Sequence, residues 1–210
     1  MKPAHDLTLL GFGPHAYPML LELAAAQWSR RPSELKVQVI HNLPASKDML
    51  AGLIPHDWPF PSFVELRDWM PSKTDGKCML GVLREPAASS VWRVFQDAKD
   101  LSESSLGVVV HPTADIAPSA VLGPGTWVQP HATVATMSQL GMCCYVNRHA
   151  SVGHHNSVSA CFQPAAQLYV AHQPIVYGCL QALFLVFWTS FHLRISGKLL
   201  KRCAKGYVRL

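Results

Sequence analysis

The chain has 210 residues, of which 49% are hydrophobic and 15% charged, and this balance excludes a disordered or fibrous protein. The formal net charge is +5, but all 13 acidic residues and 11 of the 18 Lys and Arg lie before residue 116. The last 95 residues therefore carry seven basic side chains and no carboxylate side chain, so the two parts have to be interpreted separately.

The first part of the chain has the pattern of an α/β domain. A short apolar strand is predicted over Leu7–Leu10, followed by a glycine turn over Gly11–Ala16 and a helix over 19–26. A second strand is predicted over 35–40. Glycines allow a backbone to approach a phosphate, and a helix N-terminus favours an anion, so the turn is a candidate nucleotide site. A tight turn without a ligand has the same pattern.

The rest of this domain is expected to contain more loop than regular structure. Residues 42–76 hold five prolines and several aromatic residues, which could form a lid or pack on the edge of a small sheet. A third strand is predicted over Cys78–Leu83 and a second helix over 90–97. The chain then leads through Leu106–Val110 into a different pattern.

From Val110 onward an aliphatic residue recurs every six residues, nine times in succession. The position four residues later is small in the first seven of these hexads. Neither a helix nor an alternating strand has this period, which indicates a parallel β-solenoid of triangular section. Three hexads then make a coil of 18 residues, with the aliphatic side chain inside and the small residue at the corner. The aliphatic positions are Val110, Ile116, Leu122, Val128, Val134, Leu140, Val146, Val152 and Val158.

Together with the α/β domain, these hexads resemble the sialic acid O-acetyltransferase (NeuD/PglD-type) family of hexapeptide-repeat sugar acyltransferases. The resemblance runs from about residue 7 to about residue 168 and rests on Gly11–Ala16, Cys78–Val82, Val110–Ala120 and Asn147–Asn156. It implies a Rossmann-like N-terminal domain, a left-handed parallel β-helix and a homotrimer. It also implies transfer of acetyl from acetyl-CoA to an amino or hydroxyl group of a sugar, often a nucleotide-linked one.

Acetyl transfer needs a base for the proton of the nucleophile and hydrogen-bond donors for the oxyanion. A neutral imidazole suits the first task. The resemblance assigns the base to His154, which should project outward from the coil, toward a neighbouring protomer. It places Asn147 beside the site as a supporting polar group, and it places Gly11, Gly13 and His15 near the phosphates of the sugar nucleotide. A solvated surface histidine is the alternative interpretation of His154.

Two features depart from the family pattern. Its members usually carry an acidic residue beside the base, whereas His154 lies between Gly153 and His155, and no carboxylate side chain follows Asp115. Members also carry acidic residues after the second strand, where this chain has a histidine and an asparagine at 41–42. The first departure affects the orientation of the base and the second affects nucleotide recognition.

No metal is assigned. His131 and His149 are 18 residues apart, so they should stack on neighbouring coils about 4.8 Å apart, which fits a surface ladder better than a metal site. The six cysteines show no C-x-x-C pair and no zinc-ligand spacing. We expect a reduced chain without a secretory signal, and no nucleic-acid partner.

The hexad pattern is interrupted after Val158. Residues 162–168 look like a hexad that is two residues short, and no repeat is predicted beyond Leu168. Residues 175–193 then form an uncharged apolar segment of 19 residues, which six basic residues follow. A helix of this length could cross a bilayer, but the positive-inside rule would separate the β-helix from cytoplasmic acetyl-CoA. We therefore favour a packed or interfacial helix, or a tail of altered reading frame, over a true span.

The sequence thus predicts three parts. Residues 1–107 form a Rossmann-like, sugar-nucleotide-binding domain, 108–168 a left-handed β-helix acyltransferase domain, and 169–210 a divergent apolar and basic tail. The expected function is acetyl-CoA-dependent sugar acetylation in the cytoplasm, with membrane contact through 175–210 as an option. The alternative is a catalytically impaired β-helix that assembles or binds a partner, with its tail docked on a membrane or a protein.

Overall fold

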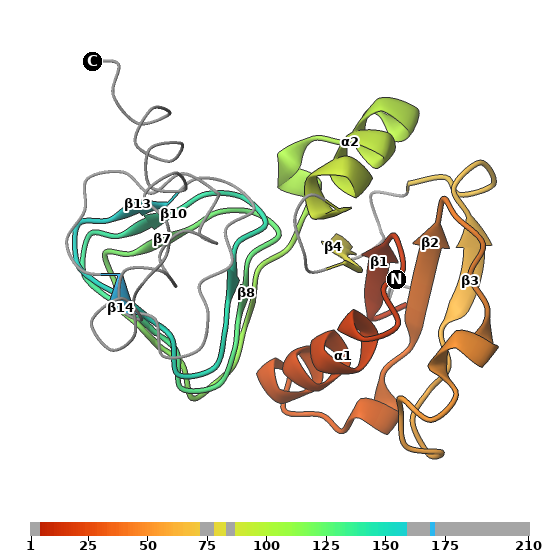
Figure 1. Cartoon of the computed structure of the whole chain (residues 1–210), viewed down its shortest axis with the longest axis horizontal. Coiled ribbons are helices and arrows are strands. Elements are labelled where there is room, and N and C mark those ends of the chain that lie inside the picture. Colours follow the sequence, from red (N-terminus) through yellow and green to blue (C-terminus); the bar gives the residue numbers. More distant parts are fainter. Residues whose placement is uncertain (1–4, 72–77, 83–86, 159–168, 171–210) are drawn as a thin grey trace, which may run out of the picture. The chain divides into compact units, whose positions relative to one another are not determined.

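The computed structural model describes residues 5–71, 78–82, 87–158 and 169–170. An α/β region comes first along the chain, and a series of two-residue parallel strands follows it (Figure 1). All of the described residues belong to one compact unit.

The α/β region is built on a parallel sheet of four strands in the order β3-β2-β1-β4. In the central strand, β1, Leu9 lies opposite Val39 on one side and Met79 on the other. All of β1 is buried, as expected for an inner strand of a parallel sheet, and all of β4 is buried as well, although it lies at an edge of this sheet. The strand bounds are β1 Leu7–Leu10, β2 Val37–His41, β3 Ser62–Glu65 and β4 Cys78–Leu80.

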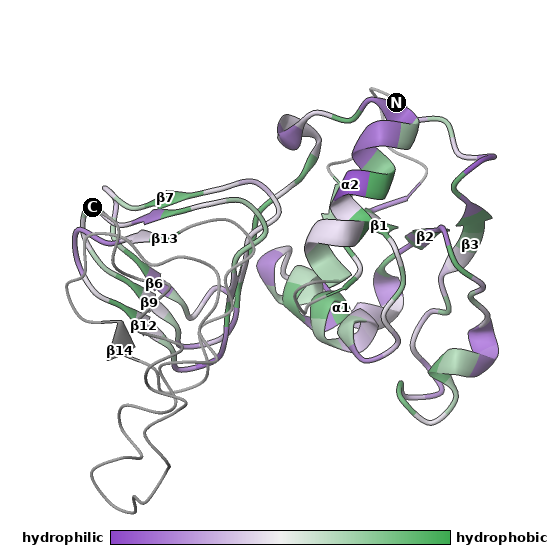
Figure 2. Cartoon of the chain, turned by 45° about the horizontal axis from the view of Figure 1, so that its top comes forward, coloured by the Kyte–Doolittle hydropathy of each residue, from purple (hydrophilic) through white to green (hydrophobic). Residues whose placement is uncertain are grey.

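Two α-helices accompany this sheet. Apolar residues dominate α1 (Ala16–Gln27), whereas α2 (Ala87–Lys99) alternates apolar and polar residues, as Figure 2 shows. In α1 the buried residues surround most of the helix, because it packs on the sheet and also on the strands that follow. The 3-10 helices are η1 Pro32–Glu34, η2 Lys47–Leu50 and η3 Glu103–Ser105.

The predicted strands and helices of this region are confirmed, with shifted ends, and one strand was missed. The helix predicted over 19–26 is α1, the one predicted over 90–97 is α2, and both are longer than predicted. The segment 42–76, predicted as mostly loop, contains β3. Since β3 pairs only with β2 and none of its residues is fully buried, it lacks the apolar alternation that reveals a strand.

From Val109 the chain forms three separate parallel sheets, and successive strands pass from one sheet to the next. Each pairing joins residues 18 positions apart, such as Trp127 with Tyr145 and Val134 with Val152. The predicted solenoid with 18 residues in a coil is therefore confirmed, and these sheets fit the left-handed β-helix that the resemblance implies. The strands are β5 Val109–Val110, β6 Asp115–Ile116, β7 Val121–Leu122, β8 Trp127–Val128, β9 Thr133–Val134, β10 Gln139–Leu140, β11 Tyr145–Val146, β12 Ser151–Val152, β13 Ser157–Val158 and β14 Tyr169–Val170.

The aliphatic position of each hexad ends its strand and points into the coil. Val128, Val134, Val146 and Val152 are fully buried, whereas the aliphatic residues of the first coil are only partly so, because no coil covers them from below. Figure 1 shows the coils stacked on one another. The pattern extends further than predicted, because β14 pairs with β12 in the same register beyond residue 168.

The corners of the coils place a non-glycine residue in the left-handed region in five successive hexads. These residues have φ values between 55° and 59°, and each precedes the buried residue of its corner. A side chain in this conformation costs roughly 1–2 kcal/mol, which glycine avoids, as Gly125 does one hexad earlier. The five are His131, Met137, Cys143, His149 and His155.

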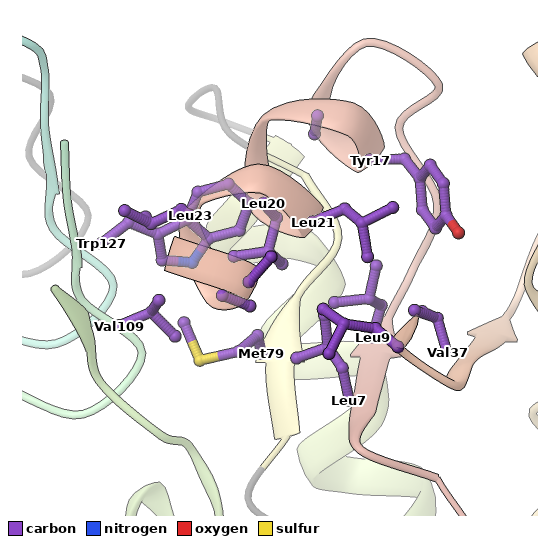
Figure 3. Packing of buried hydrophobic residues seen from close by; sticks show 14 of the residues in the cluster. Leu7, Leu9, Tyr17, Leu20, Leu21, Leu23, Val37, Met79, Val109 and Trp127 are labelled. Carbon is purple, nitrogen blue, oxygen red and sulfur yellow. The ribbon is translucent and has the colours of Figure 1, made fainter. Parts of the chain in front are cut away.

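Helix α1 packs against the first β-helical sheet. Trp127 and Val109 lie beside Leu20, Leu23 and Met79 in one buried cluster (Figure 3). Gln27 at the end of α1 also accepts a hydrogen bond from the Val110 amide, at 2.8 Å from Oε1 to N. The first sheet of the β-helix therefore presents apolar side chains on both faces, one toward the coil interior and one toward α1.

Within the described ranges, no helix is both long enough and apolar enough to span a membrane. The apolar segment 175–193 and the basic residues after it lie outside the described residues, as does the interrupted hexad over 162–168.

The left-handed corners lead to a stability prediction at Met137, whose side chain is 53% exposed and whose φ is 59°. Met137→Asn should stabilise the protein by about 0.5–1 kcal/mol, because asparagine tolerates this conformation. Met137→Val should destabilise it by about 1–2 kcal/mol, because a β-branched residue does not. Urea unfolding measures both. Thr136→Val, at the neighbouring exposed position without a positive φ, is the control, and an equal effect there would contradict the corner argument.

Candidate functional site

The glycine turn between β1 and α1 is held by hydrogen bonds to the ends of two neighbouring strands. The Gly11 amide donates to the Ile40 carbonyl and the Gly13 amide donates to the Gly81 carbonyl, both at 2.8 Å. The Gly81 amide in turn donates to the Leu10 carbonyl at 2.8 Å. The turn therefore joins β1, β2 and β4 at their carboxyl ends.

Glycine is required here by space as well as by conformation. Gly11 has a φ of 76°, and a Cβ on Gly13 would lie 2.9 Å from the Gly81 carbonyl oxygen. A Cβ on Gly81 would collide with the carbonyl group of Gly11. These three glycines thus serve the packing of the turn itself.

The same hydrogen bonds limit how the turn could bind a phosphate. The amides of Gly11 and Gly13 are already used, and Ala16 and Tyr17 donate theirs to the Gly13 carbonyl. Among the residues described here, the amides of Phe12 and His15 make no backbone hydrogen bond, and Pro14 has no N–H. His15 is exposed at the N-cap of α1.

A cavity lies at the carboxyl ends of β2 and β3, beside α2. Its volume is about 830 Å³. The sequence indicated only that 41–42 lack the acidic residues of the family, and it did not predict this cavity because β3 itself was missed. The lining residues are His41, Asn42, Leu43, Pro44, Ala45, Glu65, Leu66, Arg67, Val94, Ala98 and Lys99.

The charges of this cavity are largely paired with one another. Arg67 forms an ion pair with Glu65 at 2.6 Å, and Lys99 donates to the Arg67 carbonyl at 3.3 Å. The His41 ring donates from Nδ1 to the Leu43 carbonyl at 2.9 Å, which fixes its tautomer when it is neutral. The cavity therefore has charged groups of both signs at its rim, and its lining also includes apolar side chains.

His154 is exposed, as predicted, at the corner of residues 153–156 between β12 and β13, here called the His154 corner. Its Nδ1 lies 3.0 Å from Nδ1 of His155, and the two rings meet edge to face with centroids 5.2 Å apart. The sequence interpretation treated His155 only as a missing carboxylate. In the structure it is a hydrogen-bond partner of the candidate base.

Asn147 is half-buried at the preceding corner, residues 147–150 between β11 and β12. Its side-chain oxygen accepts a hydrogen bond from the Arg148 amide at 2.8 Å, and its carbonyl accepts one from the Ala150 amide at 3.1 Å. It therefore stabilises its own turn. Because a whole side of the coil separates this corner from His154, the structure does not bring the two candidate residues together within one chain.

The Asn147 corner also carries the predicted histidine ladder. His131 and His149 stack with their ring centroids 5.1 Å apart and their planes at 17°. His111, on the coil below, bonds through Nδ1 to the Thr113 hydroxyl at 2.8 Å, and burial lowers its pKa, with His131 adding to the effect. No group of three or more His, Cys, Asp or Glu in the described ranges is arranged to hold a metal ion.

Comparison with known proteins gives matches at the level of structure only. No family model matches the chain, and no curated protein does. A mutant of perosamine N-acetyltransferase from Caulobacter crescentus, solved with CoA and GDP-perosamine, is 15% identical, with a TM-score of 0.48 over 85% of this chain and 96% of that one. The acetyltransferase domain of PglB from Neisseria gonorrhoeae, solved with acetyl coenzyme A, is 16% identical, with a TM-score of 0.42 over 82% of this chain and 95% of that one. Both are acetyltransferases, but similarity at this level does not assign this chain to a family.

The close packing of Gly11, Gly13 and Gly81 in the turn predicts a large loss of stability when Gly81 is substituted. Gly81→Ala should destabilise the protein by about 3 kcal/mol or more, because the new Cβ collides with the backbone of the turn rather than with a side chain that can move. Gly52→Ala is the matched control: its φ is 73°, but a Cβ there meets nothing within 4 Å, so the cost should be only about 1–2 kcal/mol. Urea unfolding measures the loss of stability in both variants. Similar losses would contradict the collision expected at Gly81.

Proposed function

We propose that this chain is an acetyl-CoA-dependent acetyltransferase that acts on an amino or hydroxyl group of a nucleotide-linked sugar. The observation that carries the proposal is His154, an exposed imidazole on a β-helix corner whose Nδ1 is held by a neighbouring ring. An imidazole held through one nitrogen presents the other in a fixed direction, as a general base requires. The resemblance to the hexapeptide-repeat sugar acyltransferases supplies the reaction class.

In the proposed reaction, Nε2 of His154 accepts the proton of the sugar amine or hydroxyl while that atom bonds to the carbonyl carbon of the thioester. The tetrahedral intermediate then collapses, the carbon–sulfur bond breaks, and the CoA thiolate takes the proton from the imidazolium. Hydrogen-bond donors near the carbonyl oxygen are needed to stabilise the intermediate. Asn147 is our candidate for such a supporting polar group.

The separation of Asn147 and His154 on different corners bears on assembly. Asn147 and His154 can contribute to one site only if Asn147 comes from one chain and His154 comes from a neighbouring chain. The proposed homotrimer would meet this condition, because each chain then offers one corner to each neighbour. Acetyl-CoA would bind at this boundary.

The sugar nucleotide is assigned to the α/β region, which we propose to be a Rossmann-like domain. Its strand order has β1 at the point where the chain changes direction across the sheet, and ligands of such sheets bind at the carboxyl edge there. Gly11 and Gly13 shape the turn at this edge, and His15 is the exposed polar side chain beside it. The cavity beyond β2 and β3 would take the nucleoside.

Two observations favour a second function. The glycine amides of the turn are used within the fold, and the candidate base contacts an imidazole where the family has a carboxylate. A catalytically impaired β-helix that assembles or binds a partner would show the same features. Its tail over 175–210 would then dock on a membrane or a protein, and fractionation into soluble and membrane pellets would test that contact.

An active enzyme is expected in the cytoplasm, where acetyl-CoA is available.

Calorimetric titration with acetyl-CoA distinguishes these functions without requiring the acceptor. We expect a dissociation constant on the order of micromolar, because the inter-chain groove of an active enzyme must hold the donor. A folded protein that shows no binding would favour the impaired β-helix.

Replacing the proposed base should stop acetyl transfer without unfolding the protein. His154→Ala should lower kcat by about 10²–10⁴-fold, measured by release of CoA with sugar nucleotides as acceptors. His56→Ala is the control, because His56 is also an exposed histidine but lies outside the β-helix and has no role in the proposed site. Equal activity of the two variants would exclude His154 as the base.

A further inference from the structure

The close contact between His154 and His155 restricts where the protons of the two rings can be. A distance of 3.0 Å between the two Nδ1 atoms is a hydrogen bond, which needs one hydrogen between two nitrogens. One ring must therefore carry its proton on Nδ1, and the other must present a lone pair there. If both rings were protonated, both Nδ1 atoms would carry hydrogens and the bond would be lost.

Only one of the two arrangements is compatible with a base at His154. A neutral imidazole that donates from Nδ1 has its lone pair on Nε2, where it can accept a proton. A neutral imidazole that accepts at Nδ1 has its hydrogen on Nε2 and cannot act as a base through that atom. His155 must therefore be the acceptor, with its own hydrogen on Nε2.

The turn holds His155 in place independently of its side chain. Its backbone is in the left-handed conformation, with a φ of 57°, and its amide donates to the Thr136 carbonyl on the coil below at 3.0 Å. The next residue, Asn156, is buried, and its side-chain amide donates to the Gly153 carbonyl at 2.7 Å. The two bonds fix the turn on both sides of His155, so its ring does not have to order the backbone.

We propose that His155 is a positioning residue that selects the Nδ1–H tautomer of His154 and thereby directs Nε2 of His154 toward the acceptor. The proposal rests on the acetyl transfer proposed above. It gives His155 the orienting task that a carboxylate has in other histidine-based sites, but without the negative charge.

The absent charge has a consequence for the dependence on pH. A carboxylate partner stabilises the imidazolium form of a base, whereas a neutral imidazole does so far less. Within its turn His154 contacts the imidazole of His155, and the equivalent positions on the coil below are Thr136 and Met137. A carboxylate introduced at position 155 should therefore change the acidic limb of the pH–rate profile.

Three substitutions separate orientation from charge. His155→Asn offers an amide oxygen as acceptor and suits a positive φ, so it should keep most of kcat and leave the acidic limb in place. His155→Ala removes the acceptor and should lower kcat by between about tenfold and a hundredfold, a part of what a general base contributes. His155→Glu introduces a carboxylate and should move the acidic limb to higher pH, because protonated His154 is then stabilised.

The matched control is Met137→Ala. Met137 is exposed and has a φ of 59°, close to the 57° of His155, so both alanine variants introduce alanine into nearly the same backbone conformation. Met137→Ala should leave kcat unchanged. Equal kcat values for His155→Ala and Met137→Ala, in an enzyme that is active, would overturn the positioning role while leaving the proposed function intact.

A readout that does not depend on acetyl transfer is the ¹⁵N NMR spectrum of the histidine rings, assigned by comparison with His154→Ala. At a pH where the rings are neutral, we expect a protonated Nδ1 on His154 in the unaltered protein and in His155→Asn, and a loss of that preference in His155→Ala. A His154 ring with its hydrogen on Nε2 in the unaltered protein would overturn the proposal. If the tautomer is as expected but no acetyl transfer is found, the proposed function fails while the tautomer assignment stands.

Discussion

Burial of one aliphatic side chain in every hexad is the interaction on which the rest of the β-helix depends. Two-residue strands are too short to be stable alone, but each one pairs with strands 18 residues away, so the buried side chains form continuous columns. The corners must then be tight, which forces five non-glycine residues into the left-handed conformation. Because that conformation is fixed by stacking with the coils above and below, it also fixes where corner side chains such as His154 and His155 project.

The α/β region contributes a second rigid element, the turn in which Gly11, Gly13 and Gly81 pack closely against one another. It joins the ends of three strands through backbone hydrogen bonds, so the turn is shaped by the sheet rather than by a ligand. The amides of Gly11 and Gly13 are used in these bonds, so the proposed binding of a nucleotide would depend on neighbouring groups such as His15 and on the cavity beyond β2. The glycine turn that the sequence offers as a nucleotide site thus has a packing role in the structure.

Two corners of the β-helix differ in the contacts that their polar side chains make. At one corner, Asn147 and the stacked pair His131 and His149 make contacts within the coil. At the next, His154 is exposed and held by His155. Two neutral histidines in such contact share one proton, which would give the proposed base an orienting partner without adding a charge.

The periodic features of this protein could be predicted from its amino-acid sequence. The period of six predicted the coils, their buried columns and the stacking of His131 on His149, because residues 18 apart must lie over one another in such a solenoid. It missed β3, because an edge strand without a buried face has no periodic signal. It also could not show the cavity beyond β2, the use of the glycine amides, or the contact of His154 with His155. These depend on side-chain rotamers and on groups distant in the chain, which only the folded backbone brings to hydrogen-bonding distance.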